Sequence, residues 1–559
     1  MRTNTSQQCE DSIMRNEKRP ARLSLTIFCL LTLASAASAQ DKSVNNMPTV
    51  NPYLHNSFNP ISHENSAQTD AVDIASGSKG RTLGADDAKV LYTDIETSHH
   101  VIKNIGNKQV AYFSGAGVAI SKVDVTGENF KLIHRTMLPG HEAEEKNLTP
   151  RVKALLKKVD AAQAALDENA ILGLTDEAAK AGFKLENLTN TTYKMIDKDG
   201  FLFTIMGAGT LLKYTDDNKF EAPLRLVKQA DLRDSLPKDI AKDVSRIIGI
   251  GMTYDGHLAV VAPGVITVLD RDFKLVDMLP IPGEAVDNNI AIDETGIYVV
   301  TSKRMLKAAW NGKKLSIDEK DGGWSAGYNN MDPKIAIEKG AISRGSGTTP
   351  ALIGFGDDED KLVIIADADE KGTNLVAYWR DEIPSGFKQK PGTVSRRIAD
   401  QISIKISFLT IEPSPNVLGY EVAVLNTSYP EPVKASPWGN ALLSGLTRKP
   451  PLGVEKFIWN PKQNRFERSW TNYQIDNSDI GVGVISMPNR MLYTVHRDAG
   501  KGVLVGIDWD TGIIKSTWRM PTDSAIWGSY GNIISFAADG DMLAGGLFGI
   551  KRWNIGQDN

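Results

Sequence analysis

One supersecondary unit recurs along most of this chain and constrains its fold more than any other feature. Each copy has an apolar strand, a polar turn, a second very apolar strand, and a third strand that ends in an aromatic residue or Asp. The turns often carry Asp-Gly, as at Asp255-Gly256 and Asp539-Gly540, a pair that forms hairpins because both residues tolerate positive φ angles. A fourth strand follows in most copies, so each copy predicts one four-stranded antiparallel sheet.

The third strands supply eight positions that can be laid side by side. They are Asp124, Thr215, Asp270, Trp310, Trp379, Trp459, Trp509 and Trp553. The shortest steps, 40 residues from Asp270 to Trp310 and 44 from Trp509 to Trp553, match the length of one β-propeller blade. The sequence therefore predicts an all-β fold, an eight-bladed propeller over residues 85–559, with seven blades as the alternative.

The last copy of the unit lacks a fourth strand, because the chain ends six residues after Trp553. In a closed propeller that strand comes from the N-terminal side, and the segment from Lys89 to Ile95 is our candidate. Closure of this kind removes the free sheet edges that a long β chain would otherwise expose.

One interruption of the repeat is predicted to be a helical hairpin, at about 149–185. Thr149-Pro150 has the residue types of an N-cap and first helical position, and a second helix is expected to begin near Thr175. Apolar side chains then recur with the spacing of one helix face. They are Val152, Leu155, Leu156 and Val159.

The first 39 residues match a secretory signal peptide. A basic stretch precedes the apolar run from Leu23 to Leu33, and Ala37-Ser38-Ala39 has the small residues of a cleavage site. The run is too short to span a bilayer permanently, so we expect no membrane anchor after cleavage and a periplasmic or secreted protein. The mature chain would begin at Gln40, residues 40–84 would form a flexible N-terminal arm, and Met14 is an alternative start to Met1.

Both cysteines of the chain, Cys9 and Cys29, lie in this leader, so the mature protein has no thiol to mispair in an oxidising compartment. Without residues 1–39 the chain keeps 59 basic and 65 acidic residues, a net charge of −6. This charge argues against nucleic acid as a partner. We therefore expect a small-molecule ligand or substrate, or a periplasmic protein, as the partner.

The segment Gly506-Ile507-Asp508-Trp509-Asp510-Thr511-Gly512, followed by Trp518, resembles the tryptophan-docking repeat of the pyrroloquinoline-quinone-type propellers. The resemblance implies an eight-bladed quinoprotein-like fold, in which such turns tie neighbouring blades together. The Trp comes two residues later here than in that pattern. The dehydrogenases of this group commonly carry adjacent cysteines beside the quinone, and the mature chain has none and no Cys-x-x-Cys-His haem site. Pyrroloquinoline quinone is therefore the less favoured cofactor, and the fold alone does not fix a function.

Loops that enter the innermost strands of a propeller meet the loops between second and third strands at one mouth. Calcium-dependent propeller hydrolases of the gluconolactonase and paraoxonase type are similar in placing Asn and one acidic residue at these entrances, because a hard cation prefers carboxylate and amide oxygens. By this resemblance the candidate calcium ligands are Glu284, Asn289, Asn426 and Asn532. The alternative is that these Asn residues only cap turns.

Two further segments are candidates for catalysis. His496-Arg497-Asp498 follows an apolar strand, and a neighbouring carboxylate could tune the histidine for proton transfer; an incidental hairpin loop is the alternative. Asp367 and Asp369 could serve as acid–base carboxylates or bind a cation, with a solvated turn as the alternative. The glycine-rich run 345–350 lacks the Gly-Lys-Ser/Thr of a phosphate loop, so a tight strand entrance is the better interpretation.

These candidates favour an exported small-molecule enzyme at the propeller mouth, either a metal-assisted hydrolase or lyase or a quinone-dependent oxidoreductase. The alternative is a non-catalytic binding or assembly propeller. An enzyme predicts a deep axial pocket lined by groups such as His496, Asn289 and Asn532, whereas a scaffold predicts a plugged axis with an apolar rim patch.

Overall fold

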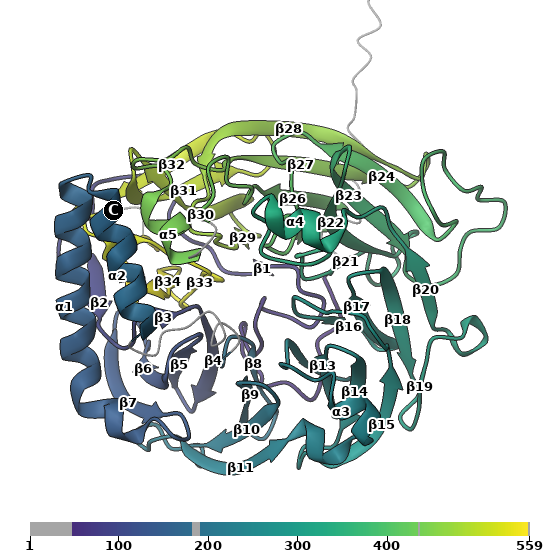
Figure 1. Cartoon of the computed structure of the whole chain (residues 1–559), viewed down its shortest axis with the longest axis horizontal. Coiled ribbons are helices and arrows are strands. Elements are labelled where there is room, and N and C mark those ends of the chain that lie inside the picture. The colour runs from purple at the N-terminus through teal and green to yellow at the C-terminus, as the bar shows by residue number, and fades with distance from the viewer. Residues whose placement is uncertain (1–46, 181–189, 434–436, 557–559) are drawn as a thin grey trace, which may run out of the picture. The chain divides into compact units, whose positions relative to one another are not determined.

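The structure is a computed structural model that describes residues 47–180, 190–433 and 437–556. The predicted leader, its predicted cleavage site and both cysteines lie outside these residues, and the described residues form one compact unit. In this unit the strands build eight sheets arranged in a ring (Figure 1). The prediction of an eight-bladed β-propeller is confirmed.

The first four blades follow one another along the chain. Blade 1 contains β4 (His99–Ile105), β5 (Lys108–Ser114), β6 (Ala119–Asp124) and β7 (Lys131–Met137). Blade 2 contains β8 (Lys194–Ile196), β9 (Leu202–Met206), β10 (Thr210–Thr215) and β11 (Arg225–Asp231). Blade 3 contains β12 (Gly249–Met252), β13 (Leu258–Ala262), β14 (Val265–Leu269) and β15 (Leu275–Pro280). Blade 4 contains β16 (Ala291–Ile292), β17 (Gly296–Val300), β18 (Arg304–Trp310), β19 (Leu315–Ser316) and β20 (Trp324–Gly327).

The next three blades continue in chain order. Blade 5 contains β21 (Ala351–Ile353), β22 (Leu362–Asp369), β23 (Gly372–Trp379) and β24 (Ile398–Ile404). Blade 6 contains β25 (Asn416–Leu418), β26 (Glu421–Leu425), β27 (Leu452–Asn460) and β28 (Arg465–Asp476). Blade 7 contains β29 (Val484–Ser486), β30 (Met491–Asp498), β31 (Lys501–Asp508) and β32 (Ile514–Arg519), with β1 (Ala71–Val72) parallel to β29.

Blade 8 joins the two ends of the described chain. Its strands are β33 (Ser535–Phe536), β34 (Met542–Ala544), β36 (Ile550–Trp553) and β2 (Ala88–Leu91). The outermost strand, β2, pairs antiparallel with β36, with Ala88 opposite Trp553. This confirms that the missing fourth strand comes from the N-terminal side. A two-stranded pair of β3 (Glu96–Thr97) and β35 (Gly546–Leu547) lies beside it.

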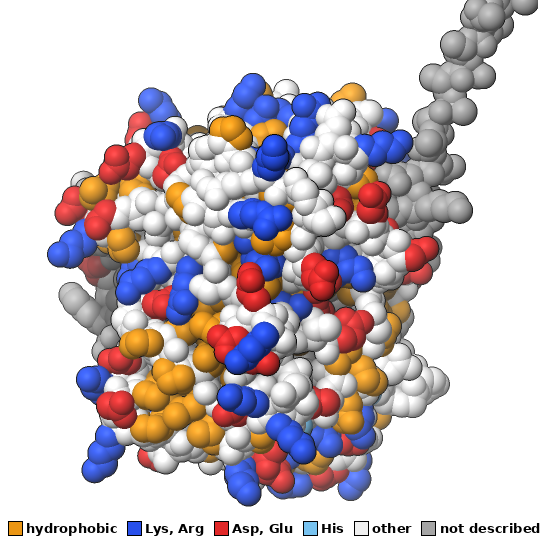
Figure 2. All heavy atoms as spheres, turned by 90° about the vertical axis from the view of Figure 1, so that its right-hand side faces the viewer, with side chains coloured by type: hydrophobic (Ala, Val, Ile, Leu, Met, Phe, Trp, Pro, Cys, Tyr) orange, Lys and Arg blue, Asp and Glu red, His pale blue; other side chains and the backbone are white. Residues whose placement is uncertain are grey.

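The outermost strand of a blade is more exposed than the inner ones. Every residue of β12, β13 and β14 is buried, whereas five of the seven residues of β11 are exposed. Inner strands are covered by neighbouring blades on both faces, which explains why they read as continuous apolar runs rather than alternating ones. On the outer face in Figure 2 basic and acidic side chains are interspersed.

The aromatic ends of the third strands connect adjacent blades. Trp459 of blade 6 donates through Nε1 to Asp360 of blade 5 at 2.7 Å, and Trp310 of blade 4 donates to Asp255 of blade 3 at 2.9 Å. In the segment that resembles the docking repeat, Trp518 is buried and stacks on Tyr493 with ring centroids 6.0 Å apart. The indoles of Trp459 and Trp310 therefore satisfy their N–H groups on the preceding blade, whereas the indole nitrogens of Trp379, Trp509 and Trp553 have no hydrogen-bond partner among the described residues.

The structure differs from the prediction of a flexible arm at residues 40–84. Its described part contains a segment that follows the inner edges of the blades, which we call the axial belt (residues 51–78). Carbonyls of the belt accept hydrogen bonds from innermost strands or the residues flanking them in blades 1, 2, 4, 5, 6 and 7. Side chains of the belt reach the other two, since Asn51 donates to Met252 O in blade 3 and Ser76 to Gly540 O in blade 8.

The belt escaped prediction because its residues are polar and show no periodicity. An innermost strand has one edge without a neighbouring strand, and its buried N–H groups need acceptors. The belt supplies them at 2.7 Å for Asn59 O to Ile102 N and 2.8 Å for Asp70 O to Ile485 N. Hydrogen bonding to the blades, together with burial of apolar side chains such as Leu54, Ile61 and Val72, fixes this segment in place.

The predicted helical hairpin is present but begins earlier than expected. It consists of α1 (Glu145–Ala164) and α2 (Glu168–Lys180), and Pro150 lies inside α1 rather than at its first position. Val152, Leu156 and Val159 are buried, which confirms the predicted apolar face. Shorter helices are α3 (Lys238–Ala241), α4 (Pro333–Glu338), α5 (Pro437–Leu443), η2 (Glu142–Glu144), η4 (Leu232–Ser235), η5 (Glu319–Asp321) and η6 (Ala525–Trp527). Within the described ranges no helix has the length and apolar character needed to cross a membrane.

Candidate functional site

The axial belt and blade 6 bring three polar side chains together at the centre of the ring. His63 Nδ1 lies 2.8 Å from Asp70 Oδ1 and 3.0 Å from Ser414 Oγ, and the Ser414 hydroxyl also donates to Asp70 Oδ2. All three side chains are almost fully buried. Both contacts of the histidine use Nδ1, so this is not the Ser-His-Asp relay, in which the acid and the serine bond opposite nitrogens. The arrangement instead holds the imidazole ring in a fixed position.

The backbone of the belt is strained at this point. His63, Glu64, Gln68 and Asp70 have φ angles of 67°, 66°, 60° and 54°. Residues other than glycine rarely adopt this region, at a cost of about 1–3 kcal/mol each, and such residues gather at functional sites. Gln68 is held by Asn289, whose side-chain amide donates to Gln68 Oε1 at 3.2 Å. The fold keeps a polar turn at the axis despite this cost.

Two aromatic rings and an amide extend the cluster toward the mouth. Tyr193 precedes β8 and stacks on His99 at 5.5 Å and on His63 at 6.2 Å. Its hydroxyl donates to Asn288 Oδ1, which also accepts from Thr349 Oγ1 at 2.8 Å. Burial raises the pKa of Tyr193 and lowers that of His99, so both rings are neutral near pH 7. We call His63, Asp70, His99, Tyr193, Asn288 and Ser414 the axial cluster.

Glu412 adjoins the axial cluster two residues before Ser414. Asn288 Nδ2 donates to the Glu412 carbonyl at 3.1 Å, and Ser343 Oγ donates to carboxylate Oε2 at 2.7 Å. The other carboxylate oxygen is without a hydrogen-bond partner in the described part of the chain. Burial raises the pKa of Glu412 to about 7, and the negative charge of Asp287 adds to the rise. The residue as a whole is partly exposed, but this second carboxylate oxygen is buried.

Asp367, a candidate from the sequence, lies behind Glu412 near the end of β22. Its Oδ1 accepts from Thr410 Oγ1 and from the Ala368 N–H, both at 2.7 Å. Oδ2 is buried and finds no partner in the residues that the structure describes. Burial raises the pKa of Asp367 to about 7, and Glu412 contributes to the rise. Asp369, the other predicted carboxylate, is more exposed and caps the turn at Lys371 N.

The four predicted calcium ligands are used in other ways. Both carboxylate oxygens of Glu284 accept from Arg304, and Thr301 Oγ1 donates to one of them at 2.6 Å. Asn289 bonds Ile250 N and the belt, and Asn426 bonds Leu452 O and Ser428 N at 3.0 and 2.9 Å. The only carboxylate of the set is therefore already neutralised, and the residues do not fit a hard cation as arranged.

Asn532, the fourth of these residues, is buried at the entrance of blade 8, and both atoms of its amide group lack partners among the described residues. Across the whole described chain, no group of three or more His, Cys, Asp or Glu side chains has the spacing of a metal site.

The run His496-Arg497-Asp498 is divided by the alternation of β30. His496 Nδ1 accepts from Asp476 N at 2.9 Å, whereas Arg497 points the other way and donates to Asp479 at 2.5 Å. Asp498 is exposed and pairs with an arginine of β32 at 2.6 Å. The three residues therefore do not act as one catalytic group, although burial lowers the pKa of His496 and keeps its ring neutral.

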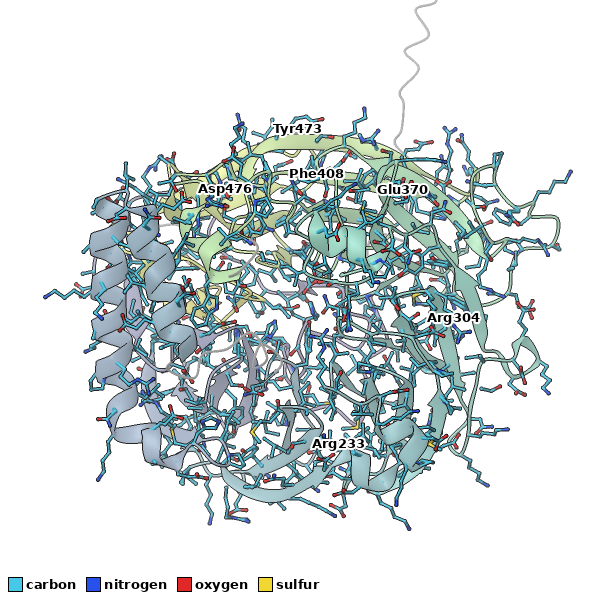
Figure 3. The ribbon with its side chains drawn as sticks, viewed as in Figure 1. Arg233, Arg304, Glu370, Phe408, Tyr473 and Asp476 are labelled. Carbon is cyan, nitrogen blue, oxygen red and sulfur yellow. The ribbon has the colours of Figure 1, made fainter. Side chains whose placement is uncertain are left out.

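His496 and Arg497 line a groove of about 490 Å³ between blades 6 and 7. Its rim carries Arg448 and Lys449 from the loop after α5, and the Asp476 carboxyl lies on its inner side. In Figure 3 Asp476 lies on blade 6, well separated from Arg304 of blade 4, the partner of Glu284. The two sets of residues predicted from the sequence thus belong to different places on the ring.

Comparisons with known proteins find similar proteins but no matching family model. No protein-family model matches the chain. A protein of Archaeoglobus fulgidus that is described only as uncharacterized is 30% identical over 329 residues. That match covers 55% of this chain and 60% of the relative, so the chain spans about three fifths of the relative's length.

Solved structures with a similar chain path include two quinohemoprotein alcohol dehydrogenases. The one from Pseudomonas putida HK5 is 9% identical, covers 89% of this chain and 76% of its own, and has a TM-score of 0.48. The one from Comamonas testosteroni is 11% identical, with coverages of 88% and 79% and the same TM-score of 0.48. A putative 6-phosphogluconolactonase from Bacteroides fragilis is 11% identical, covers 76% of this chain and 95% of its own, and has a TM-score of 0.36. The fold itself is established by the eight sheets described above.

Sequence reasoning missed most of the axial cluster. His63 and Asp70 lie in the polar stretch that was predicted to be a flexible arm, and Glu412 and Ser414 lie in a short loop without a motif. One signal was available: His63-Glu64 and Asp70 are ionisable residues in a segment otherwise rich in Asn and Ser. Their proximity to Ser414, some 350 residues away, depends on ring closure and has no local signature.

Proposed function

We propose that this protein is an exported small-molecule enzyme that transfers protons at the propeller mouth, with Glu412 as the group that meets the substrate. The observation that carries the proposal is the Glu412 carboxyl, which keeps one buried oxygen without a hydrogen-bond partner among the described residues and has a pKa raised to about 7. A carboxyl with this pKa exists in both protonation states at neutral pH. It can therefore donate and accept a proton near neutral pH at a small free-energy cost.

Asp367 and the axial cluster, which adjoin Glu412, also favour this proton transfer. A negative charge on Glu412 raises the pKa of Asp367, because the two carboxylates repel each other. When one of them ionises, the other therefore keeps its proton more readily. The neighbouring rim holds Asp287 between Arg246 and Arg344, at 2.5 and 2.6 Å, which gives this side of the mouth one excess positive charge. We infer a small polar substrate that undergoes hydrolysis or elimination.

The test is a turnover screen with the purified full-length protein. Lactones and carboxylate esters are followed by proton release, and uronic-acid sugars by the ultraviolet absorbance of the double bond that elimination forms. We expect turnover of at least one class, and Glu412→Gln should lower kcat by roughly 10²- to 10⁴-fold because it removes the general acid–base group. Asp369→Asn, at the more exposed end of β22, is the matched control and should retain turnover.

Retention of wild-type turnover by Glu412→Gln would refute the assignment of this residue. A screen in which no class is turned over would refute the enzyme and favour the alternative, a binding or assembly propeller. That alternative has an observation of its own, since the axial belt contacts all eight blades and occupies the inner edges where a deep channel would otherwise run.

A further inference from the structure

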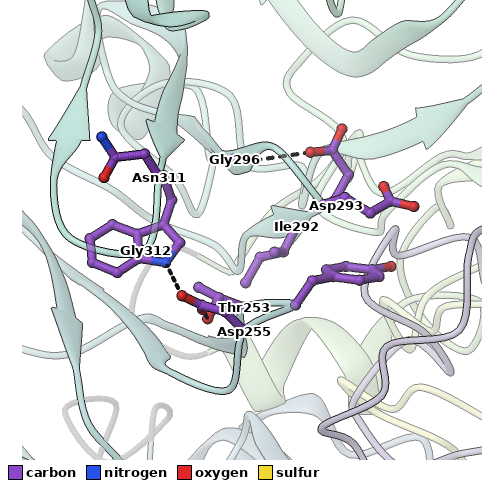
Figure 4. Close-up of a pocket in the computed structure, with 10 residues that line it drawn as sticks. Thr253, Asp255, Ile292, Asp293, Gly296, Asn311 and Gly312 are labelled. Carbon is purple, nitrogen blue, oxygen red and sulfur yellow. Dashed lines mark hydrogen bonds between the residues drawn. The ribbon is translucent and has the colours of Figure 1, made fainter.

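A second cavity lies away from the axial cluster, between blades 4 and 5. It has a volume of about 170 Å³, and its walls include Arg380, Lys361, Phe355 and Tyr254. Residues 48–49 cover one side, where the Tyr254 hydroxyl donates to Thr49 O at 2.7 Å. An adjoining hollow of about 270 Å³ shares Asp293 with it, and Figure 4 shows this residue with its bond to Gly296 N.

Arg380 is the residue of this cavity that indicates a ligand. Arg380 is only 5% exposed, and its Nη2 donates to Gly354 O at 2.7 Å. Nε and Nη1 are buried and have no hydrogen-bond partner among the described residues. Donors on a buried charged group are costly to leave unpaired, at roughly 1–3 kcal/mol or more each, so an acceptor is expected beside them.

The nearby carboxylate does not fill this role. Asp293 Oδ2 lies 3.6 Å from Arg380 Nε, beyond hydrogen-bond distance, and takes its bond from the Tyr298 hydroxyl at 2.7 Å. Asp293 Oδ1 already accepts from Thr295 and Gly296. Lys361 adds a second positive charge to the wall, and Glu294 lies in the same wall as a second acidic residue.

We propose that this cavity binds a small oxyanion, a carboxylate or phosphate group, held by the Arg380 guanidinium with Lys361 at its side. The planar guanidinium is suited to both groups because it offers parallel N–H donors. Phe355 supports the guanidinium from one face, with the ring centroid 5.4 Å from Cζ. The site is independent of Glu412 and of the proposed reaction.

The experiment measures thermal unfolding of the full-length protein in rising concentrations of inorganic phosphate or acetate, with ionic strength held constant by chloride. A ligand that binds only the folded state raises the midpoint in a saturable way. We expect saturation with at least one of the two ions. Phosphate alone would identify a phosphate site, acetate alone a carboxylate site, and both a general oxyanion site. A midpoint that follows neither ion would overturn the proposal.

Two variants separate binding from stability. Arg380→Gln should abolish the saturable shift, whereas Arg397→Gln should keep it even if its starting midpoint falls. Arg397 is a matched control because it is a buried arginine at the same blade, but its two Nη atoms bond Trp379 O, Asp381 O and Glu319. If Arg380→Gln does not fold, Lys361→Met should weaken the response by several-fold. An equal loss in the Arg380 and Arg397 variants would count against the site.

Discussion

Asp367 is a carboxyl group that the fold holds in surroundings poor in water. It is 1% exposed, and burial is the main reason that its pKa rises from 3.8 to about 7. The folded protein therefore binds this proton more tightly than the unfolded chain does. Between about pH 4 and pH 7 the folded state carries more protons, so the free energy of unfolding falls as the pH rises through this window.

We expect Asp367→Asn to flatten this dependence, because the amide cannot ionise and still accepts from Thr410. The difference between wild type and variant should change by up to about 4 kcal/mol between pH 4 and pH 8, the upper bound for a shift of about three units. Urea unfolding at each pH provides the measurement. Asp369→Asn is the control, and parallel curves for wild type and Asp367→Asn would contradict the burial of a titrating carboxyl.

At the scale of elements, the segment that directly follows the axial belt packs closely against blade 7. A Cβ atom at Gly80 would lie 2.3 Å from the backbone nitrogen of Thr517 in blade 7. Nearby, the Ser516 hydroxyl donates to Ser78 O. Gly84, four residues later, has only the Asp87 carboxylate within 4 Å of such an atom, at 3.5 Å.

These two glycines make a matched pair for a test of this packing. Gly80→Ala should lower the free energy of unfolding by about 2 kcal/mol, because backbone must move to accommodate the methyl group. Gly84→Ala should change it by less than about 0.5 kcal/mol. Chemical denaturation of both variants gives the comparison, and equal effects would show that the chain at Gly80 is not packed tightly against blade 7.

The sequence predicted elements well where apolar periodicity or turn chemistry defined them. The Asp-Gly hairpins, the aromatic third strands and the apolar face of α1 all have local signatures, and all are present. The start of α1 was missed because Glu145–Thr149 continues the helix ahead of Pro150. The belt and the axial cluster were missed because their positions depend on contacts with strands hundreds of residues away, such as His63 with Ser414.

At the scale of the whole molecule, the ring is closed by hydrogen bonds between β2 and β36. Asn554 N donates to Asp87 O at 2.7 Å, and in an antiparallel pair the bonded positions alternate. The backbone N–H of Lys89, opposite Arg552, therefore points toward β36 and belongs to the ladder. The backbone N–H of Val90, opposite Lys551, points away from β36. Closure thus depends on specific N–H groups of one short edge strand.

Proline at these two neighbouring positions tests the closure. Lys89→Pro removes a ladder donor and should lower stability by roughly 2 kcal/mol, while Val90→Pro should cost less because its N–H is outside the ladder. Differential scanning calorimetry of both variants provides the measurement. A larger loss for Val90→Pro would mean that the register at the closing strand differs from the one described.

The closing strand and the axial belt also determine when this protein can fold. Residues 51–91 come early in synthesis, but their partners include β29, β36 and the turn at Gly540 at the far end of the chain. Loop closure over such separations is slow, and contacts this distant in sequence favour slow folding. An unfinished chain therefore has no complete ring to adopt, and the parts of its first polar segment that pair with blades 7 and 8 stay without these partners until the last blades have been made.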